Sequence, residues 1–236
     1  MADLNLDFCK RVVIDTAKMP WVNSPMPGVR RKPLARAAAE GGHITSVVQY
    51  SPGSYFSGHY HPQGEEIFVL EGTFSDENGD YEKGSYLRNP PGSYHQPFSK
   101  NGCTILVKLN QFDPQDKKSV VINSNTTEWQ QGSGGLQVMP LHDFAGQHTA
   151  LVKWPAGEIF HLHEHVGGEE VFVLSGHFKD EYGSYPKHSW IRSPHLSTHR
   201  PFVDQETIIL VKVGHLELTH HSDSKTQGNN CLTKGK

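Results

Sequence analysis

Residues 58–74 read GHYHPQGEEIFVLEGTF, and residues 162–178 read LHEHVGGEEVFVLSGHF. The two stretches align without a gap at an offset of 104 residues (162 − 58). The similarity continues in SDENGDYEKGSYLRNP (75–90) against KDEYGSYPKHSWIRSP (179–194), and in ILVK at 105–108 and again at 209–212. Roughly 30 of about 66 aligned positions are identical, whereas chance would give a handful. We therefore infer that one structural unit occurs twice in this chain.

The repeat predicts two domains, at residues 15–112 and 122–216. The polar, proline-containing stretch 110–120 links them, and residues 217–236 lack apolar periodicity, which predicts a disordered tail. Two copies of this length are too few and too long for a solenoid. Duplication of one domain is the interpretation we adopt.

Short apolar runs separated by turn residues fill each unit. EIFVLEG (66–72) and EVFVLSG (170–176) are dense apolar strands that end in glycine. DENGDY (76–81) and DEYGSY (180–185) have the composition of turns between two strands. Many short strands with frequent turns predict an all-β fold, as a barrel or jelly roll in each unit.

A repeated set of histidines and glutamates carries the functional signal. Side chains alternate along a strand, so His59 and His61 share a face, and Glu65 has the same parity. A single His-x-His is usually a pair of surface histidines, but here the whole set recurs at fixed spacing. The predicted metal ligands are His59, His61, Glu65 and His95 in the first unit, and His163, His165, Glu169 and His199 in the second. Nitrogen and oxygen ligands without thiolate suit a divalent metal ion. Fe(II) and Zn(II) are favoured, and Mn(II), Ni(II) and Cu(II) remain alternatives.

At these residues the sequence resembles a bicupin of the ChrR-like cupin family. The first cupin motif reads Gly53, His59, His61, Glu65, Gly72, and again Gly157, His163, His165, Glu169, Gly176. The second motif reads Gly84, Pro90, Gly92, His95. The second copy keeps Pro194 and His199 but has His188 and Leu196 in place of the two glycines. The resemblance implies two tandem cupin barrels, each a double-stranded β-helix.

The same resemblance implies two functions that we keep open. Some relatives are metal-dependent dioxygenases that cleave carbon–carbon bonds in diketones and hydroxylated aryl ketones. ChrR proteins themselves are anti-sigma factors with an additional zinc domain that bears a Cys-x-x-Cys, a motif not found in this sequence, so the alternative is a metal-binding sensor or regulatory module without turnover. No catalytic residue is assigned. The metal centre of the first domain is favoured as the reactive one, because the second copy has lost the two glycines.

The composition of the chain limits the classes of binding partner that we expect. The net charge is −3 and no basic surplus exists, which argues against nucleic acid. No apolar run is long enough to span a bilayer, so no membrane partner is expected and we predict a cytoplasmic protein. Three cysteines, far apart in sequence, make a disulfide framework unexpected. We expect a small-molecule ligand or substrate, no organic cofactor, and a homodimer as the one protein partnership to test.

Overall fold

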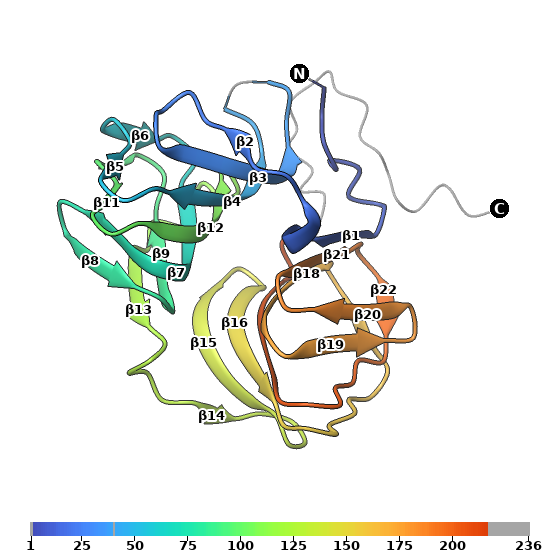
Figure 1. Cartoon of the computed structure of the whole chain (residues 1–236). Helices are drawn as coiled ribbons and strands as arrows, with labels where there is room; N and C mark the ends of the chain where they lie inside the picture. Colours follow the sequence, from blue (N-terminus) through green and yellow to red (C-terminus); the bar gives the residue numbers. More distant parts are fainter. Residues whose placement is uncertain (1, 40, 217–236) are drawn as a thin grey trace. The chain divides into compact units, whose positions relative to one another are not determined.

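The computed structural model describes residues 2–39 and 41–216, and the predicted tail at 217–236 lies outside them. The chain divides into two compact units, each built from two segments (Figure 1). Unit 1 comprises Met1–Leu6 and Lys18–Glu128, and unit 2 comprises Asp7–Ala17 and the chain from Trp129 onward. Among the described residues nearly all regular structure is β-strand, which confirms the all-β prediction.

Unit 1 contains one large sheet in the order β13-β9-β7-β12-β4-β3-β2, with β5, β8 and β11 attached at its side, and a separate pair β6–β10. Its strands are β2 (Val22–Asn23), β3 (Val29–Arg36), β4 (Ile44–Tyr50), β5 (Ser54–Tyr55), β6 (His59–His61), β7 (Glu65–Asp76), β8 (Gly79–Glu82), β9 (Ser85–Asn89), β10 (Ser93–His95), β11 (Phe98–Ser99), β12 (Cys103–Leu109) and β13 (Val120–Asn123).

Unit 2 repeats this arrangement in the sheet β1-β21-β18-β23-β16-β15-β14, with the separate pairs β17–β22 and β19–β20. Its strands are β1 (Val12–Asp15), β14 (Gln130–Gln131), β15 (Gln137–Phe144), β16 (Gln147–Trp154), β17 (His163–His165), β18 (Glu169–Ser175), β19 (His177–Asp180), β20 (Gly183–Pro186), β21 (Ser189–Ser193), β22 (Ser197–His199) and β23 (Thr207–Val213). A short 3₁₀ helix, η1 (Thr16–Lys18), follows β1.

The first strand of the chain belongs to the second unit. β1 pairs antiparallel with β21, so that Val12 faces Arg192 (Figure 1). β13, which follows the first barrel along the chain, pairs in the same way with β9, and Val120 faces Arg88. The sequences VVID (12–15) and VVIN (120–123) therefore complete equivalent sheet edges. Pairing an edge strand removes unpaired backbone groups, and here the covering strand comes from outside the repeat that it completes.

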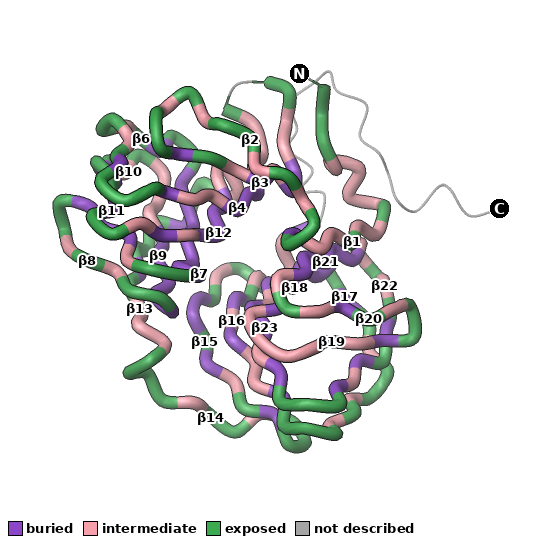
Figure 2. The backbone as a smooth tube through the Cα atoms, in the orientation of Figure 1, coloured by how far each residue is buried: buried purple, intermediate pink, exposed green. Residues whose placement is uncertain are grey.

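The core of each unit lies between its β-layers. Ile67 and Val69 on β7, at most 1% exposed, belong to the buried cluster of unit 1. Val171 and Val173 on β18 occupy the equivalent places in unit 2. Figure 2 shows buried residues along β7, β9 and β12 and exposed residues on β8. Burying an aliphatic side chain of this size stabilises the fold by about 1.5–3 kcal/mol.

The two residues that replace motif glycines keep the glycine conformation. Gly92 has φ 88° and its counterpart Leu196 has φ 60°, while Gly84 has φ 90° and its counterpart His188 has φ 72°. Each pair keeps the same backbone hydrogen bond: the Gly92 amide donates to His61 O and the Leu196 amide to His165 O, both at 2.9 Å. The turns that carry β10 and β22 are thus alike. A non-glycine residue in this left-handed region costs about 1–2 kcal/mol.

We expect the substitution Leu196→Gly to raise the thermal stability of metal-free unit 2 by about 1 kcal/mol, because it removes this strain from a side chain that is 41% exposed. The reverse change at the matched position, Gly92→Leu, should lower the stability of unit 1 by a similar amount. Differential scanning calorimetry measures both effects. A loss of stability in Leu196→Gly would show that packing of the leucine outweighs its strain.

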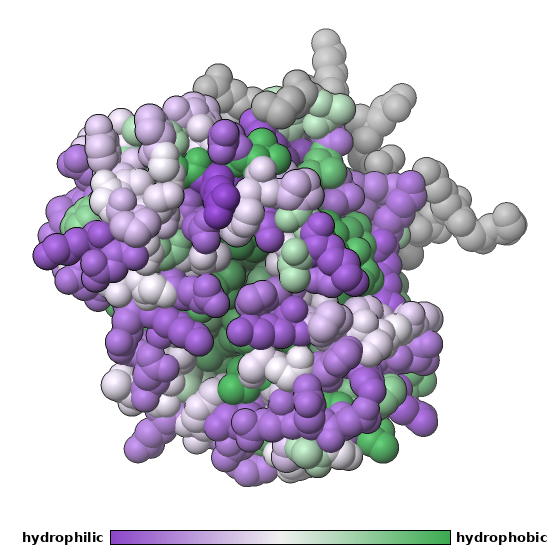
Figure 3. All heavy atoms as spheres, in the orientation of Figure 1, coloured by the Kyte–Doolittle hydropathy of each residue, from purple (hydrophilic) through white to green (hydrophobic). Residues whose placement is uncertain are grey.

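The face drawn in Figure 3 is mostly hydrophilic, in keeping with the charge of the chain. Within the described ranges, no helix has the length and apolar character needed to cross a membrane. Cys103 is a free, buried thiol.

Candidate metal centres

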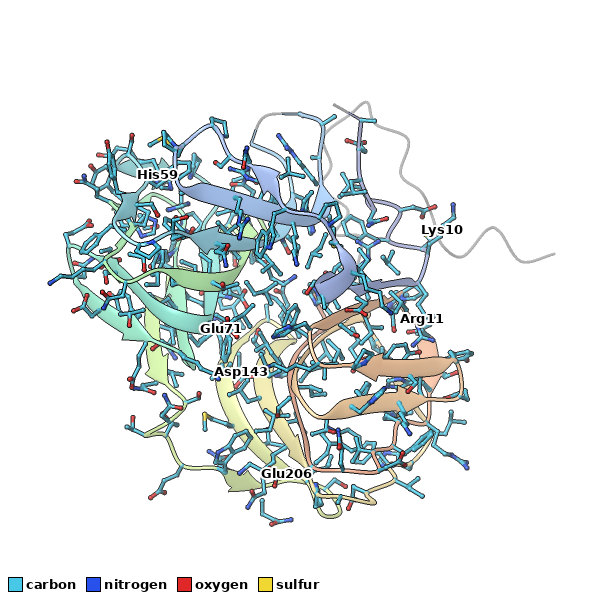
Figure 4. The ribbon with its side chains drawn as sticks, in the orientation of Figure 1. Lys10, Arg11, His59, Glu71, Asp143 and Glu206 are labelled. Atoms are coloured by element: carbon cyan, nitrogen blue, oxygen red, sulfur yellow. The ribbon has the colours of Figure 1, made fainter. Side chains whose placement is uncertain are left out.

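The predicted residues of unit 1 meet at the ends of three strands. His59 and His61 lie on β6, Glu65 begins β7, and His95 ends β10. Because β6 and β10 pair antiparallel, His95 lies directly across from His59. Alternation along β6 then places His61 on the same face as His59. Figure 4 shows the position of His59 in unit 1.

The side-chain atoms of this cluster lie within contact distance. His61 Nε2 is 2.9 Å from His95 Nε2, and each of these nitrogens is 3.3 Å from Glu65 Oε2. The ring of His59 lies 4.6 Å from that of His61 and 5.2 Å from that of His95, measured between centroids. His61, Glu65 and His95 are buried, while His59 is half-buried. His59, His61 and His95 alone form a group suited to a metal ion, with Glu65 beside it.

Unit 2 forms the same cluster with all four predicted residues in one group. Ligand atoms of His163, His165, Glu169 and His199 all lie within 4.8 Å of one another. His165 Nε2 and His199 Nε2 are 3.6 Å and 3.7 Å from Glu169 Oε2. The strand β22 places His199 opposite His163. The structure therefore brings together the predicted residues of both units.

The donor atoms fit a divalent metal ion. In unit 2, His165 Nε2 and His199 Nε2 are buried and lack a hydrogen-bond partner. A buried imidazole nitrogen without a partner is costly, and a cation would satisfy both at once. Ligand atoms bound at about 2.1 Å to one metal lie roughly 3.0–3.5 Å apart, close to the 3.3 Å separations in unit 1. That these atoms hold a metal, and which metal, stays a prediction.

Local contacts prepare the histidines as neutral ligands. His59 Nδ1 lies 2.7 Å from the Ser57 carbonyl and His163 Nδ1 lies 3.0 Å from the His161 carbonyl, so Nδ1 donates and Nε2 keeps its lone pair. Burial, together with the neighbouring imidazoles, lowers the pKa of both His61 and His165 to about 3. Neither residue has to lose a proton to bind a metal near neutral pH.

Burial raises the pKa of the two glutamates, whereas it lowers the pKa of these histidines. It raises the pKa of Glu65, which also accepts a hydrogen bond from Asn89 at 3.0 Å. It raises the pKa of Glu169 to about 7. A metal must displace this proton, because only the carboxylate form is a ligand.

Metal binding at unit 2 should therefore weaken as the pH falls below 7. Zinc titrated calorimetrically into His61→Ala protein, in which unit 1 is disabled, should release nearly one more proton at pH 6 than at pH 8. Glu169→Gln in the same background should lose this difference. Equal proton release from both variants would show that another group supplies the proton.

A second layer of residues, which the sequence did not reveal as functional, orients the third histidine of unit 2. His199 Nδ1 is 3.2 Å from Asp180 Oδ2. Asp180 in turn accepts hydrogen bonds from Arg11 at 2.6 Å and from the Tyr185 hydroxyl at 2.7 Å. Burial would raise the pKa of Asp180, but these partners hold it at about 2. The carboxylate therefore stays charged and fixes the ring so that Nε2 points at Glu169.

Unit 1 has the aspartate without the arginine. Asp76 Oδ2 lies 3.5 Å from His95 Nδ1, and Asp76 Oδ1 accepts from the Tyr81 hydroxyl at 3.2 Å. By the register of β1 and β13, Ser119 stands where unit 2 has Arg11. The sequence offered one signal for these aspartates: Asp76 and Asp180 are identical residues at equivalent positions of the two repeats, within stretches that otherwise resemble turns. Arg11 gave none, because only the pairing of β1 with β21 brings it to this site (Figure 4).

Replacing Arg11 by methionine should lower the zinc affinity of unit 2 by about 10- to 100-fold, the usual effect of losing a residue that orients a metal ligand. Competition with a chromogenic chelator in the His61→Ala background measures this. Lys10→Met is the matched control, since the Lys10 side chain is 77% exposed and pairs with Asp7. Unchanged affinity in Arg11→Met would show that Arg11 has no role in metal binding at unit 2.

The cluster of unit 1 borders a cavity of about 90 Å³. His59 and Glu65 form part of its wall, and the rest is largely apolar, including Val29, Phe56 and Ile105. The volume is well below the 300–1,000 Å³ of sites for drug-sized ligands. A metal held by the cluster would face a small, mostly apolar space.

Two repeated arginines brace the structure instead of facing a ligand. Arg88 donates to Glu66 at 3.2 Å and to Asp116 at 2.5 Å, and it lies 3.9 Å over the ring of Phe112. Arg192 lies 4.7 Å over the ring of Phe8 and donates to the Asp7 carbonyl at 3.2 Å. Both are buried. Arg88 thus attaches the segment that contains Phe112 and Asp116 to the sheet of unit 1, and Arg192 attaches the segment that contains Asp7 and Phe8 to the sheet of unit 2.

Comparison with known proteins agrees with this architecture. The ChrR Cupin-like domain family matches the chain twice, at residues 9–113 and 117–217. No curated protein sequence matches the chain.

Solved structures with the same fold are distant in sequence. A "putative dioxygenase" from Nostoc punctiforme is 18% identical with a TM-score of 0.72, over 93% of this chain and 88% of that one. Protein YlbA from E. coli is 15% identical with a TM-score of 0.69, over 93% and 95%. Oxalate decarboxylase from Bacillus subtilis, in a deletion mutant, is 13% identical with a TM-score of 0.59, over 86% and 76%. At such identities the likeness establishes the fold.

Proposed function

Because the chain belongs to the ChrR Cupin-like domain family, with the family domain matched twice, we propose that it is a metal-dependent oxidoreductase of the dioxygenase type. The substrate would be a small diketone or aryl-ketone-like compound. One observation carries the proposal: in unit 1 a half-buried histidine and a glutamate of the candidate metal cluster line a small cavity. A structural neighbour named as a dioxygenase supports the class of reaction.

Some residues of unit 1 would bind the metal, and others shape the cavity beside it. His59, His61, Glu65 and His95 would hold the metal, with Fe(II) or Zn(II) as the leading candidates. The metal would supply Lewis acidity toward a carbonyl or enolate oxygen of the substrate. Glu65, whose pKa burial raises, is the group beside the cavity that could take a proton from the substrate. The apolar wall excludes water around the bound ketone.

Unit 2 is better suited to a structural metal. Its four candidate ligands all belong to one group, as in closed four-coordinate sites. Its third histidine is fixed by the Asp180–Arg11 pair, which unit 1 lacks. A tightly oriented, complete ligand set favours retention of the metal over exchange of ligands. We therefore assign turnover to unit 1.

Protein purified without air and without a histidine tag should contain bound divalent metal and consume O2 when given a β-diketone or an aryl ketone. His61→Ala should lower the rate of O2 uptake by more than 100-fold, a loss beyond that expected for residues that only orient ligands. The matched change in unit 2, His165→Ala, should retain most of the rate. Metal content per chain, measured alongside, should fall in both variants.

The same experiment decides between an enzyme and a sensor. Zinc held in both units, with no O2 uptake after reconstitution with Fe(II), would overturn the oxygenase proposal. It would favour the metal-binding regulatory module. Loss of uptake in His165→Ala but not in His61→Ala would move the reaction to unit 2.

A further inference from the structure

One cationic side chain lines the cavity of unit 1 together with the metal cluster. Arg31 lies on β3, and it shares the cavity wall with His59 and Glu65. Its Nη2 donates to Ser24 Oγ at 2.6 Å. Its Nε is buried and has no hydrogen-bond partner. Arg31 therefore lines a small cavity and keeps a guanidinium nitrogen without a hydrogen-bond partner among the described residues.

No carboxylate of the described chain neutralises this arginine. Its guanidinium donates to the neutral Ser24 hydroxyl. Glu65, the acidic residue of the same wall, is engaged by Asn89, His61 and His95. Burial lowers the pKa of Arg31, and the charge of Arg36 lowers it further. A half-buried cation without a counter-ion is unfavourable, and a bound anion would relieve that cost.

The equivalent position in unit 2 has no charge. Arg31 faces Val48 across β3 and β4, and Val138 faces Val152 across β15 and β16. Both strand pairs carry the same irregularity two residues further on, after Pro33 and after Pro140. Val138 is therefore the structural counterpart of Arg31. The arginine is a feature of the cavity of unit 1 and not a requirement of the barrel.

We propose that Arg31 binds the carboxylate of an anionic substrate whose keto group faces the metal cluster of unit 1. This rests on the proposed function and names its substrate class: a small β-keto acid is preferred over a neutral diketone. A guanidinium offers paired donors that match a carboxylate. The cavity of about 90 Å³ restricts the remainder of the molecule to a few carbon atoms.

Two ligands of nearly equal shape separate the effect of the carboxylate charge on affinity from the effect of shape. Acetoacetate and acetylacetone differ by a carboxylate oxygen in place of a methyl group. Calorimetric titration of zinc-loaded protein should show that acetoacetate binds at least tenfold more tightly than acetylacetone, since hydrogen bonds to charged groups are the stronger ones. In Arg31→Met this preference should disappear. In Arg31→Lys part of it should return.

Arg30→Met is the matched control. Arg30 neighbours Arg31 on β3 but is exposed and donates to Gln49, so the preference for acetoacetate should remain. Equal affinity for the two ligands in the unaltered protein, no binding of either one, or a preference that survives Arg31→Met would overturn the proposal. Because binding is measured without turnover, an inert protein that still selects acetoacetate through Arg31 would sink the oxygenase proposal alone.

Discussion

The convergence of three imidazoles and one carboxylate in a buried place is the constraint on which the architecture of each unit depends. His61 Nε2 and His95 Nε2 lie 2.9 Å apart beside Glu65, all three side chains being buried. Such a group is stable only if the backbone holds it and if a cation or a proton neutralises it. Burial raises the pKa of Glu169 to about 7, which reflects the same cost in unit 2.

Backbone conformation in each unit supports this convergence. The turn before His199 keeps a left-handed residue even where leucine has replaced glycine, so the strain is tolerated at a place that positions a candidate ligand. The hydrogen bond from Leu196 N to His165 O ties that turn to the strand of another candidate ligand. Although His188 and Leu196 replace the two motif glycines, the turns of the second site keep their conformation. The two units differ in their surrounding residues and not in their turns.

Those surrounding residues separate the two sites chemically. In unit 2, Arg11 reinforces the aspartate that orients the third histidine. In unit 1 that arginine is missing, and another arginine, Arg31, faces the cavity instead. Arg11 thus acts on a candidate metal ligand of unit 2, whereas Arg31 lines the cavity of unit 1. Under the proposed function, unit 2 would keep a metal for structure and unit 1 would use a metal for chemistry.

The sequence by itself determined the repeat, the all-β fold and the candidate ligands. This was so because the strand period of two and the offset of 104 residues place His59, His61 and Glu65, with their counterparts, on equivalent faces. Only the tertiary structure decided which residues surround them. Arg11 reaches Asp180 because β1 joins the sheet of unit 2, and Arg31 reaches the cavity through the register of β3 and β4. Contacts between segments far apart in the chain depend on strand pairing, which local periodicity does not encode.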